Sequence, residues 1–236
     1  MGTKTNYWQN VWQERGAKAS FLDPIKFDGF DLGPGKLCKK QVEFLAKKIK
    51  QSLNLNKNDV ILEVGCGAGM TLGPISNFVK LAYGVDFADS LLTRAKGFYP
   101  ELRLITGEAN DLPFRDKMFD KVYSFSVFEY FPSLNYAEKA IKEMIRVLKI
   151  DGVIFIGDIP DQSKKKEILE FRAKIKIPEG FWRSSIKERL NHQHYKVKLL
   201  KKLFMEKGFT CEFSQQDIPR YGYNSFRFNL VAKIIA

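Results

Sequence analysis

The chain has few of the residues that bind metals or form disulfide bonds. Its 236 residues include three cysteines and two histidines. The cysteines are far apart and odd in number (Cys38, Cys66 and Cys211), which argues against a disulfide framework and fits a reducing compartment. The histidines, His192 and His194, stand together without a nearby thiol or a second histidine pair. We therefore expect no metal site.

Long apolar runs and an apolar leader are also missing. No stretch approaches the roughly 20 apolar residues that a membrane-spanning helix needs, and the first residues lack the apolar core of a signal peptide. We expect a cytoplasmic protein without a membrane span. The hydrophobic content of 44% is enough to build a core. The length fits one domain, with room for an added lobe.

Positive charge is present in excess. The formal net charge is +12, and residues 159–208 hold 14 basic and 6 acidic side chains, so +8 of that charge lies in this segment. A basic field attracts anionic partners such as nucleic acids, phosphates, acidic sugars or membrane surfaces. A lysine-rich surface that serves only solubility explains the same composition, and the two interpretations stay open here.

The most informative stretch is a strand-like run followed by a glycine cluster. The run Val60–Val64 has the length and β-branched content of a buried strand. Gly65, Gly67 and Gly69 follow it, and a helix-like pattern comes next. Glycine allows positive φ angles and a close approach of a ligand to the backbone. A strand, a glycine turn and a helix are the elements with which α/β proteins bind nucleotides.

The glycine spacing separates the ligand classes. A dinucleotide fingerprint needs G-x-G-x-x-G and a phosphate-binding loop needs G-x-x-x-x-G-K-[ST], whereas this turn reads G-x-G-x-G with Glu63 two residues before its first glycine. The pattern E-x-G-x-G-x-G after an apolar strand resembles motif I of class I S-adenosylmethionine-dependent methyltransferases. A tight strand-to-helix connection without a ligand is the alternative for the turn taken alone.

Strands and helices alternate along the chain. The sequence predicts helices over residues 36–52, 89–97, 134–148 and 196–207. It predicts strands over residues 59–64, 81–86, 102–106, 119–125, 153–156, 210–214 and 226–235, with a turn at residues 151–152. Such alternation favours a mostly parallel sheet with right-handed crossovers. The last two strands are joined only by a loop, so we expect them to pair antiparallel.

With the resemblance, this order of elements implies a Rossmann-like, doubly wound, mostly parallel seven-stranded α/β sheet with a C-terminal antiparallel hairpin and a helical cap. We divide the chain into an N-terminal helical lid (1–58), a Rossmann-like core that binds S-adenosylmethionine (59–158), a substrate-side cap (159–195), and a C-terminal helix with the closing strands (196–236). The cap segment leaves the carboxyl edge of the sheet, where ligands bind, and is too long for an ordinary connection.

Further motifs extend the resemblance over residues 60–158. They are an acid at the end of the second strand, a G-E-A-x-x-L-P-F segment, and F-D-K-V-Y-S-F-S-V-F-E-Y-F. The resemblance implies that the cofactor contacts Glu63, Gly65, Cys66, Gly67, Asp86, Phe87, Glu108, Ala109, Ser124, Phe125, Trp8 and Trp12.

Each predicted contact has a stated role. Asp86 would accept hydrogen bonds from the ribose hydroxyls, although an acid that merely caps a turn is the alternative. Phe87 would lie against the adenine, and Glu108 with Ala109 would contact its amino group. Ser124 and Phe125 would line the methionine end. Trp8 and Trp12 would belong to a helical lid, unless they are ordinary packing residues.

The catalytic group stays open. Many relatives carry histidine where this chain has Tyr130, which leaves Tyr130, His192 and His194 as weak candidates. Imidazole titrates near neutrality and suits a base, but a structural histidine pair is as good an explanation.

For the acceptor we expect a small or medium-sized molecule that is methylated on oxygen or nitrogen and can bear an acidic group. The cap residues that suggest this are Lys164, Lys165, Lys166, Phe171, Phe181, Trp182 and Arg183. The expected cofactor is S-adenosyl-L-methionine, with S-adenosyl-L-homocysteine as product and no metal. The alternative is a nucleic-acid methyltransferase or an RNA-binding protein that uses the basic cap. The D/N-P-P-Y/F tetrad of N6-adenine enzymes is absent near the fourth strand.

Overall fold

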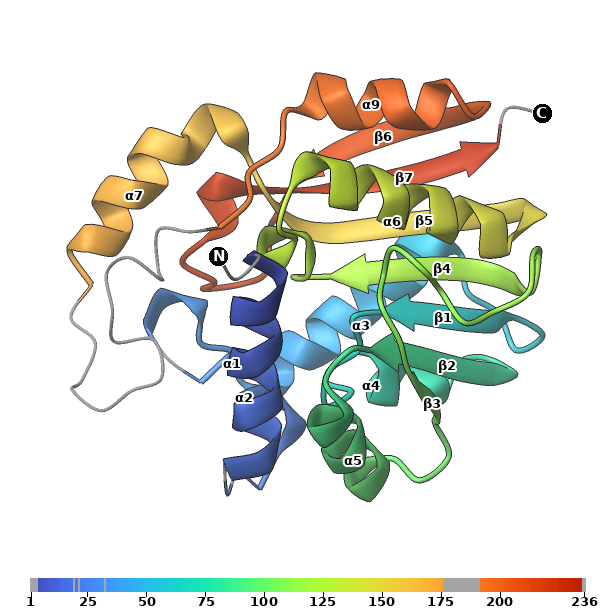
Figure 1. The fold of residues 1–236 in the computed structure, drawn as a ribbon, viewed down its shortest axis with the longest axis horizontal. Helices are drawn as coiled ribbons and strands as arrows, with labels where there is room; N and C mark the ends of the chain where they lie inside the picture. Colours follow the sequence, from blue (N-terminus) through green and yellow to red (C-terminus); the bar gives the residue numbers. More distant parts are fainter. Residues whose placement is uncertain (1–3, 19, 21, 32, 176–191, 235–236) are drawn as a thin grey trace.

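We describe a computed structural model of the chain over residues 4–18, 20, 22–31, 33–175 and 192–234. These residues form a seven-stranded sheet in the order β3-β2-β1-β4-β5-β7-β6 (Figure 1). The strands are β1 (Val60–Val64), β2 (Leu81–Asp86), β3 (Arg103–Thr106), β4 (Phe119–Phe125), β5 (Leu148–Pro160), β6 (Phe209–Gln215) and β7 (Arg227–Ile234). Strands β1 to β5 run parallel, and β7 runs antiparallel to both β5 and β6. The predicted Rossmann-like sheet with a closing antiparallel hairpin is confirmed.

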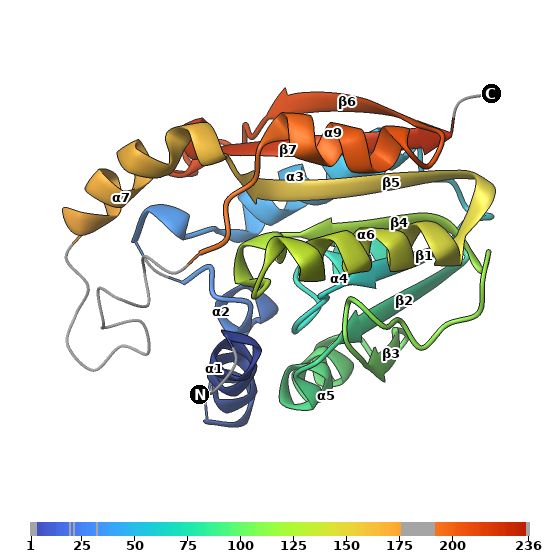
Figure 2. The same ribbon diagram turned by 45° about the horizontal axis from the view of Figure 1, so that its top comes forward.

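Helices cover both faces of the sheet. They are α1 (Lys4–Lys18), α2 (Pro24–Phe27), α3 (Lys39–Leu53), α4 (Leu72–Ser76), α5 (Asp89–Phe98), α6 (Leu134–Val147), α7 (Lys165–Ala173) and α9 (Val197–Met205). Figure 2 shows α6 and α9 on one face and α3 and α4 on the other. Helices α1 and α2 lie beside α5, at the end of the sheet toward which the parallel strands point (Figure 1). Four 3-10 turns complete the described elements: η1 (Gly33–Gly35), η2 (Phe128–Tyr130), η3 (Gln162–Lys164) and η4 (Asn224–Phe226).

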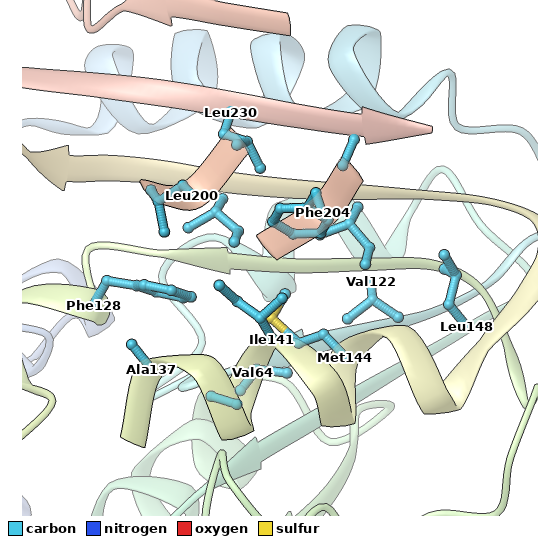
Figure 3. Close-up of a cluster of buried hydrophobic side chains, with 14 of the residues drawn as sticks. Val64, Val122, Phe128, Ala137, Ile141, Met144, Leu148, Leu200, Phe204 and Leu230 are labelled. Carbon is cyan, nitrogen blue, oxygen red and sulfur yellow. The ribbon is translucent and has the colours of Figure 1, made fainter. Parts of the chain in front are cut away.

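The 3.6-residue pattern of α6 explains how this helix packs. Ser133 caps its N-terminus by accepting a hydrogen bond from the Tyr136 N–H. Figure 3 shows the apolar stripe of α6, with Ile141 and Met144, facing Val122 of the sheet. Apolar side chains of α9 and β7 join the same buried cluster. Helices α6 and α9 therefore pack firmly against one face of the sheet, whose carboxyl edge they support.

One local prediction is wrong. Residues 151–152, Asp-Gly, were expected to form a turn before a short strand, but β5 runs without interruption over Leu148–Pro160. Its pairing with β4 shifts register between Phe119↔Leu148 and Lys121↔Val153. The extra residues bulge out of the ladder, so the glycine serves a β-bulge instead of a turn.

Helix α3 packs on the sheet as a core element. Its Ile49 and Leu53 are fully buried in the cluster that includes Ile61 of β1. We therefore propose that only α1 and α2 of the segment 1–58 form a lid, and that α3 belongs to the core; the remaining boundaries stay as proposed from the sequence. None of the helices described is both long enough and apolar enough to span a membrane.

Candidate active site

A pocket opens at the carboxyl ends of β1, β2 and β4, beneath α1. Its lining includes every residue expected from the sequence to contact the cofactor except Ser124. Further lining residues are Gln9, Asp28, Phe30, Val64, Met70, Thr71, Val85, Leu91, Gly107, Ser126, Val127, Tyr130, Phe131, Pro132 and Tyr136. The topology thus brings six separated sequence segments to one place: residues 8–12, 28–30, 63–71, 85–91, 107–109 and 125–136.

The glycine turn after β1 has the backbone that its composition predicts. Gly65, Gly67 and Gly69 have φ angles of 77°, 50° and 84°, which favour glycine. A Cβ on Gly65 would lie 2.4 Å from Val127 Cγ2, and one on Gly67 would lie 2.3 Å from Asp28 Oδ1. The turn therefore needs glycine for space as well as for conformation.

Asp86 joins the glycine turn to the start of α5. Its Oδ2 accepts a hydrogen bond from the Gly67 N–H at 2.9 Å, and its Oδ1 accepts one from the Ala88 N–H at 2.9 Å. Burial raises the pKa of Asp86 to about 6, against the opposing effect of these hydrogen bonds. Each carboxylate oxygen keeps acceptor capacity for a ligand.

Glu63 lies deeper, on β1. The hydroxyls of Thr71 and Tyr123 both donate hydrogen bonds to its carboxylate, the latter at 2.9 Å. Burial raises the pKa of Glu63 to about 8. The carboxylate thus ties β1 to β4 and to the residue that precedes α4, and still lines the pocket.

Glu108 links the two sides of the pocket mouth. The Tyr136 hydroxyl of α6 donates a hydrogen bond to its Oε2 at 2.5 Å, and the Gln9 amide of α1 donates to its Oε1. Burial, followed by the neighbouring Glu108, raises the pKa of Tyr136. Glu108 therefore holds α1 against the core.

The family comparison agrees with this geometry. The family model described as a methyltransferase domain matches residues 62–156, from β1 through most of β5. Residues 62–156 are a class I methyltransferase domain. The sequence-based prediction of this class is confirmed for the domain.

Curated relatives share this methyltransferase domain over part of their length. The sterol 4-C-methyltransferase of Caenorhabditis elegans is 28% identical over 150 residues, 61% of this chain and 42% of the relative. The uncharacterized methyltransferase YcgJ of Bacillus subtilis is 30% identical over 135 residues, which are 54% of this chain and 52% of the relative. Peramine synthetase of Metarhizium rileyi is 29% identical over 178 residues, 71% of this chain but 6% of the relative. The chain thus spans less than two thirds of the curated relatives it matches.

Solved structures share the fold across nearly the whole chain. Phosphoethanolamine N-methyltransferase 1 of Haemonchus contortus, in complex with phosphoethanolamine and S-adenosylhomocysteine, has a TM-score of 0.67 and 15% identity, covering 100% of this chain and 50% of that one. Magnesium protoporphyrin IX methyltransferase of Synechocystis PCC 6803, with bound S-adenosylhomocysteine, has a TM-score of 0.64 and 12% identity, covering 98% and 100%. At such identity the likeness shows the fold.

Aromatic residues of α1 close one side of the pocket in the methyltransferase domain. The Trp8 and Trp12 rings are buried and contact the Tyr130 ring, with centroids 4.8 and 5.2 Å apart. Helix α1 is held on α5 by the Ser90 hydroxyl, which donates to the Gln13 carbonyl at 2.7 Å, and by other polar contacts. The predicted lid residues therefore face the pocket.

Ser124 is the exception among the predicted contacts. It is fully buried within β4, and its hydroxyl has no hydrogen-bond partner among the described residues. Ser126 and Val127, just past the strand end, line the pocket instead. The position of Ser124 gives no support to a role at the methionine end, whereas Phe125 does face the pocket.

The two histidines are absent from the pocket lining, although the His192 ring contacts the lining rings of Trp8 and Tyr130, with centroids 5.4 Å away in both cases. The Nδ1 atom of His192 is 2.5 Å from Glu129 Oε2, and that of His194 is 2.9 Å from the His192 carbonyl. Burial is the main cause that lowers the pKa of His192 to about 3 and that of His194 to about 4. Their placement favours the structural explanation over a catalytic base.

Glu129 is the centre of a buried charged cluster. Its Oε2 lies 2.6 Å from Arg227 Nη2 on β7 and 3.7 Å from Arg172 Nη2 on α7. Despite its burial, Arg227 and His192 hold the pKa of Glu129 well below its usual range. This carboxylate connects both described ends of the cap segment to the methyltransferase domain. No local sequence pattern predicts this cluster, since Arg227 lies 98 residues from Glu129.

Other parts of the predicted cap lie away from the pocket or beyond the described residues. Phe181, Trp182 and Arg183 are outside the described part of the chain. Phe171 packs on Phe226, with centroids 5.3 Å apart. The run Lys164, Lys165 and Lys166 is absent from the pocket lining. Groups of three or more residues suited to a metal ion are not found among the described residues.

The charge of the pocket is one-sided. Four carboxyl side chains line it: Asp28, Glu63, Asp86 and Glu108. Among the described residues, no lysine, arginine or histidine lines the pocket. The remaining lining is largely aromatic and aliphatic. In this partly desolvated setting, such a pocket favours a ligand that carries positive charge next to a flat ring system.

Proposed function

We propose that the protein is an S-adenosylmethionine-dependent methyltransferase. The single observation that carries the proposal is the four-carboxylate pocket at the glycine turn of a methyltransferase domain. S-adenosylmethionine carries a net positive charge, because its sulfonium and ammonium groups outweigh its single carboxylate, and its adenine is flat, so its chemistry complements this lining. Nucleotide cofactors with phosphate groups would meet repulsion there.

The cofactor contacts follow from the lining. Asp86, with free acceptor capacity at the end of β2, would bind the ribose hydroxyls. Phe87, Glu108 and Ala109 would surround the adenine, and the glycine turn with Phe125 would hold the methionine end. Trp8 and Trp12 would cover the cofactor and exclude water.

For the acceptor we propose a small or medium-sized molecule methylated on nitrogen or oxygen. A sulfonium methyl group is already activated, so an atom with a lone pair needs mainly alignment with the methyl carbon and sulfur. The phosphoethanolamine N-methyltransferase among the fold relatives, by its name, acts on a small amine, whereas a sterol 4-C-methyltransferase is named for a carbon acceptor. An acidic group on the acceptor has no support from the described pocket, because Lys164, Lys165 and Lys166 do not line it.

Two measurements test the proposal. Calorimetry with S-adenosylmethionine should show one site per chain, and mass spectrometry of the purified protein should detect the cofactor or its product. A metabolite mixture incubated with methyl-labelled cofactor should then yield a labelled small molecule. A folded protein that binds neither S-adenosylmethionine nor S-adenosylhomocysteine would contradict the proposal.

A further inference from the structure

Asp28 is a pocket residue that the sequence motifs did not indicate. It follows α2 and comes from the N-terminal lid, yet its carboxylate sits on the glycine turn of the core. Its Oδ1 accepts a hydrogen bond from the Ala68 N–H at 2.6 Å, and its Oδ2 accepts one from the Met70 N–H at 3.0 Å. Forty residues of sequence separate these groups, so the contact is tertiary.

The position of Asp28 is fixed from the lid side. Arg15 of α1 donates a hydrogen bond from Nε to the Phe27 carbonyl at 2.9 Å and another to the Lys26 carbonyl. Its Nη2 also lies 2.9 Å from Asp31 Oδ1. The guanidinium thus holds the chain on both sides of Asp28. Asp28 is half-buried, and Gly67 leaves room for its carboxylate where any Cβ would collide.

This carboxylate changes what the turn can bind. Successive backbone N–H groups in a glycine-rich turn form a concave donor site that ordinarily takes an anion, such as a phosphate. Here two of those donors are already used by the chain's own anion. A phosphate placed there would lose its donors and would face the negative charge of Asp28 and the nearby Asp86. An ammonium group would be attracted.

We propose that Asp28 sets the ligand specificity of the glycine turn by binding the α-ammonium group of the cofactor and rejecting phosphate-bearing nucleotides. The inference rests on the proposed function, because it assigns Asp28 to the amino-acid end of S-adenosylmethionine. It adds a residue of the lid to the binding machinery, so docking of α1 and α2 completes the site.

The test compares two ligands that differ only in the amino-acid end. S-adenosylhomocysteine carries the α-ammonium group, and 5′-methylthioadenosine keeps the adenosine and thioether without it. Asp28→Asn should weaken S-adenosylhomocysteine binding about tenfold or more, as expected for loss of a charged hydrogen-bond partner, and should change 5′-methylthioadenosine binding by less than about twofold. Asp151→Asn, an exposed acid on β5 at the opposite end of the sheet, is the matched control and should change neither.

The second measurement is the affinity for ADP, a nucleotide that carries phosphate groups. Asp28→Ala frees both N–H groups and removes the charge, so its affinity for ADP should rise about tenfold over wild type. Equal losses of both adenosyl ligands in Asp28→Asn would show that the residue only shapes the turn and would overturn the inference. Unchanged S-adenosylhomocysteine binding would overturn it too, while leaving the methyltransferase proposal intact. Wild-type protein that binds neither ligand would instead contradict the proposed function.

Discussion

Individual residues shape the pocket through contacts of single atoms. Asp86 bonds the backbone on two sides, and Gly67 has no room for a methyl group. Neither the hydrogen bonds of Asp86 nor the space at Gly67 involves the hydrophobic core. Substitutions of these two residues should therefore alter ligand binding more than folding.

Asp86→Ala should weaken S-adenosylmethionine binding roughly tenfold or more, because removing a ribose partner leaves buried polar groups unsatisfied. Its contacts to Gly67 and Ala88 make a modest loss of stability part of the result. Calorimetry measures the affinity, and thermal unfolding shows that the domain still folds. Equal affinities of variant and wild type would refute the ribose assignment.

Gly67→Ala should abolish detectable cofactor binding, because its Cβ would lie 2.3 Å from Asp28 Oδ1 in a backbone with φ of 50°. The matched control is Gly97→Ala on α5, where nothing lies within 4 Å of the added Cβ. Circular dichroism should show a helical signal for both variants, and only the control should bind. Binding by Gly67→Ala would mean that the turn is only a connection between strand and helix.

Among the elements, the cap segment and the sheet meet at a group of buried charges around one acid after β4, beside backbone contacts such as the hydrogen bond from the Tyr195 N–H to the Pro160 carbonyl at 2.9 Å. Glu129 is 4% exposed and lies beside Arg227 on β7, Arg172 on α7 and His192 at the end of the cap segment. One hydrogen bond, from the Gln193 N–H to the Glu129 carbonyl at 2.9 Å, strengthens this connection.

Glu129→Ala should destabilise the protein by about 3 kcal/mol, because it leaves the buried Arg227 Nη2 without its carboxylate partner, while Nη1 keeps its hydrogen bond to the Asp158 carbonyl. For a chain of this size, each kcal/mol lowers the melting temperature by about 2–4 °C. The control is Glu138→Ala, which removes an exposed acid paired with Lys142 on α6 and should leave the melting temperature unchanged. Differential scanning calorimetry measures both, and similar melting temperatures would contradict a central role for Glu129.

Most elements follow from sequence periodicity, because local patterns determine them. Strand β1, the glycine turn and β2 lie where the sequence places them, and their site residues are adjacent in the motif. The Asp-Gly pair at 151–152 misled the prediction, since the same dipeptide suits a turn and a bulge. Asp28 and the partners of Glu129 could not be predicted, because their roles arise only from contacts between distant segments.

The acidic pocket makes the stability of the entire protein depend on pH. Burial is the main cause that raises the pKa values of Asp28, Glu63 and Asp86 to about 7, 8 and 6. Carboxyl groups with raised pKa values favour the folded state when protonated, so their contribution is lost as the pH rises through those values. His192 and His194, with lowered pKa values, act in the opposite direction below their ordinary 6.5.

Between pH 6.5 and 8.5, therefore, the melting temperature of the ligand-free protein should fall as the pH rises. Scanning calorimetry at constant ionic strength measures this slope. Glu63→Gln should flatten it, because the amide does not ionise. A cationic ligand favours the ionised carboxylates, so S-adenosylmethionine should stabilise the protein more at the higher pH. A melting temperature that rises with pH in this range would be inconsistent with the raised pKa values.

The net charge of +12 keeps the nucleic-acid alternative testable. If RNA were the substrate, binding would fall by orders of magnitude between roughly 50 and 200 mM salt, and replacing Lys164, Lys165 and Lys166 with alanine would weaken it. We expect neither, because the proposed acceptor is small and a few charged contacts are screened far less steeply. Filter binding with a mixed-sequence RNA decides between them.

The four carboxylates of the pocket also bear on turnover. Methyl transfer removes the positive charge of the sulfonium, so the cofactor enters as a cation and leaves as a neutral thioether with the same adenosine and amino-acid end. A pocket lined by Asp28, Glu63, Asp86 and Glu108 attracts the first more strongly than the second. Under the proposed function, methyl transfer itself lowers the affinity of the pocket for the product, S-adenosylhomocysteine. This limits product inhibition and helps the next S-adenosylmethionine to displace the product.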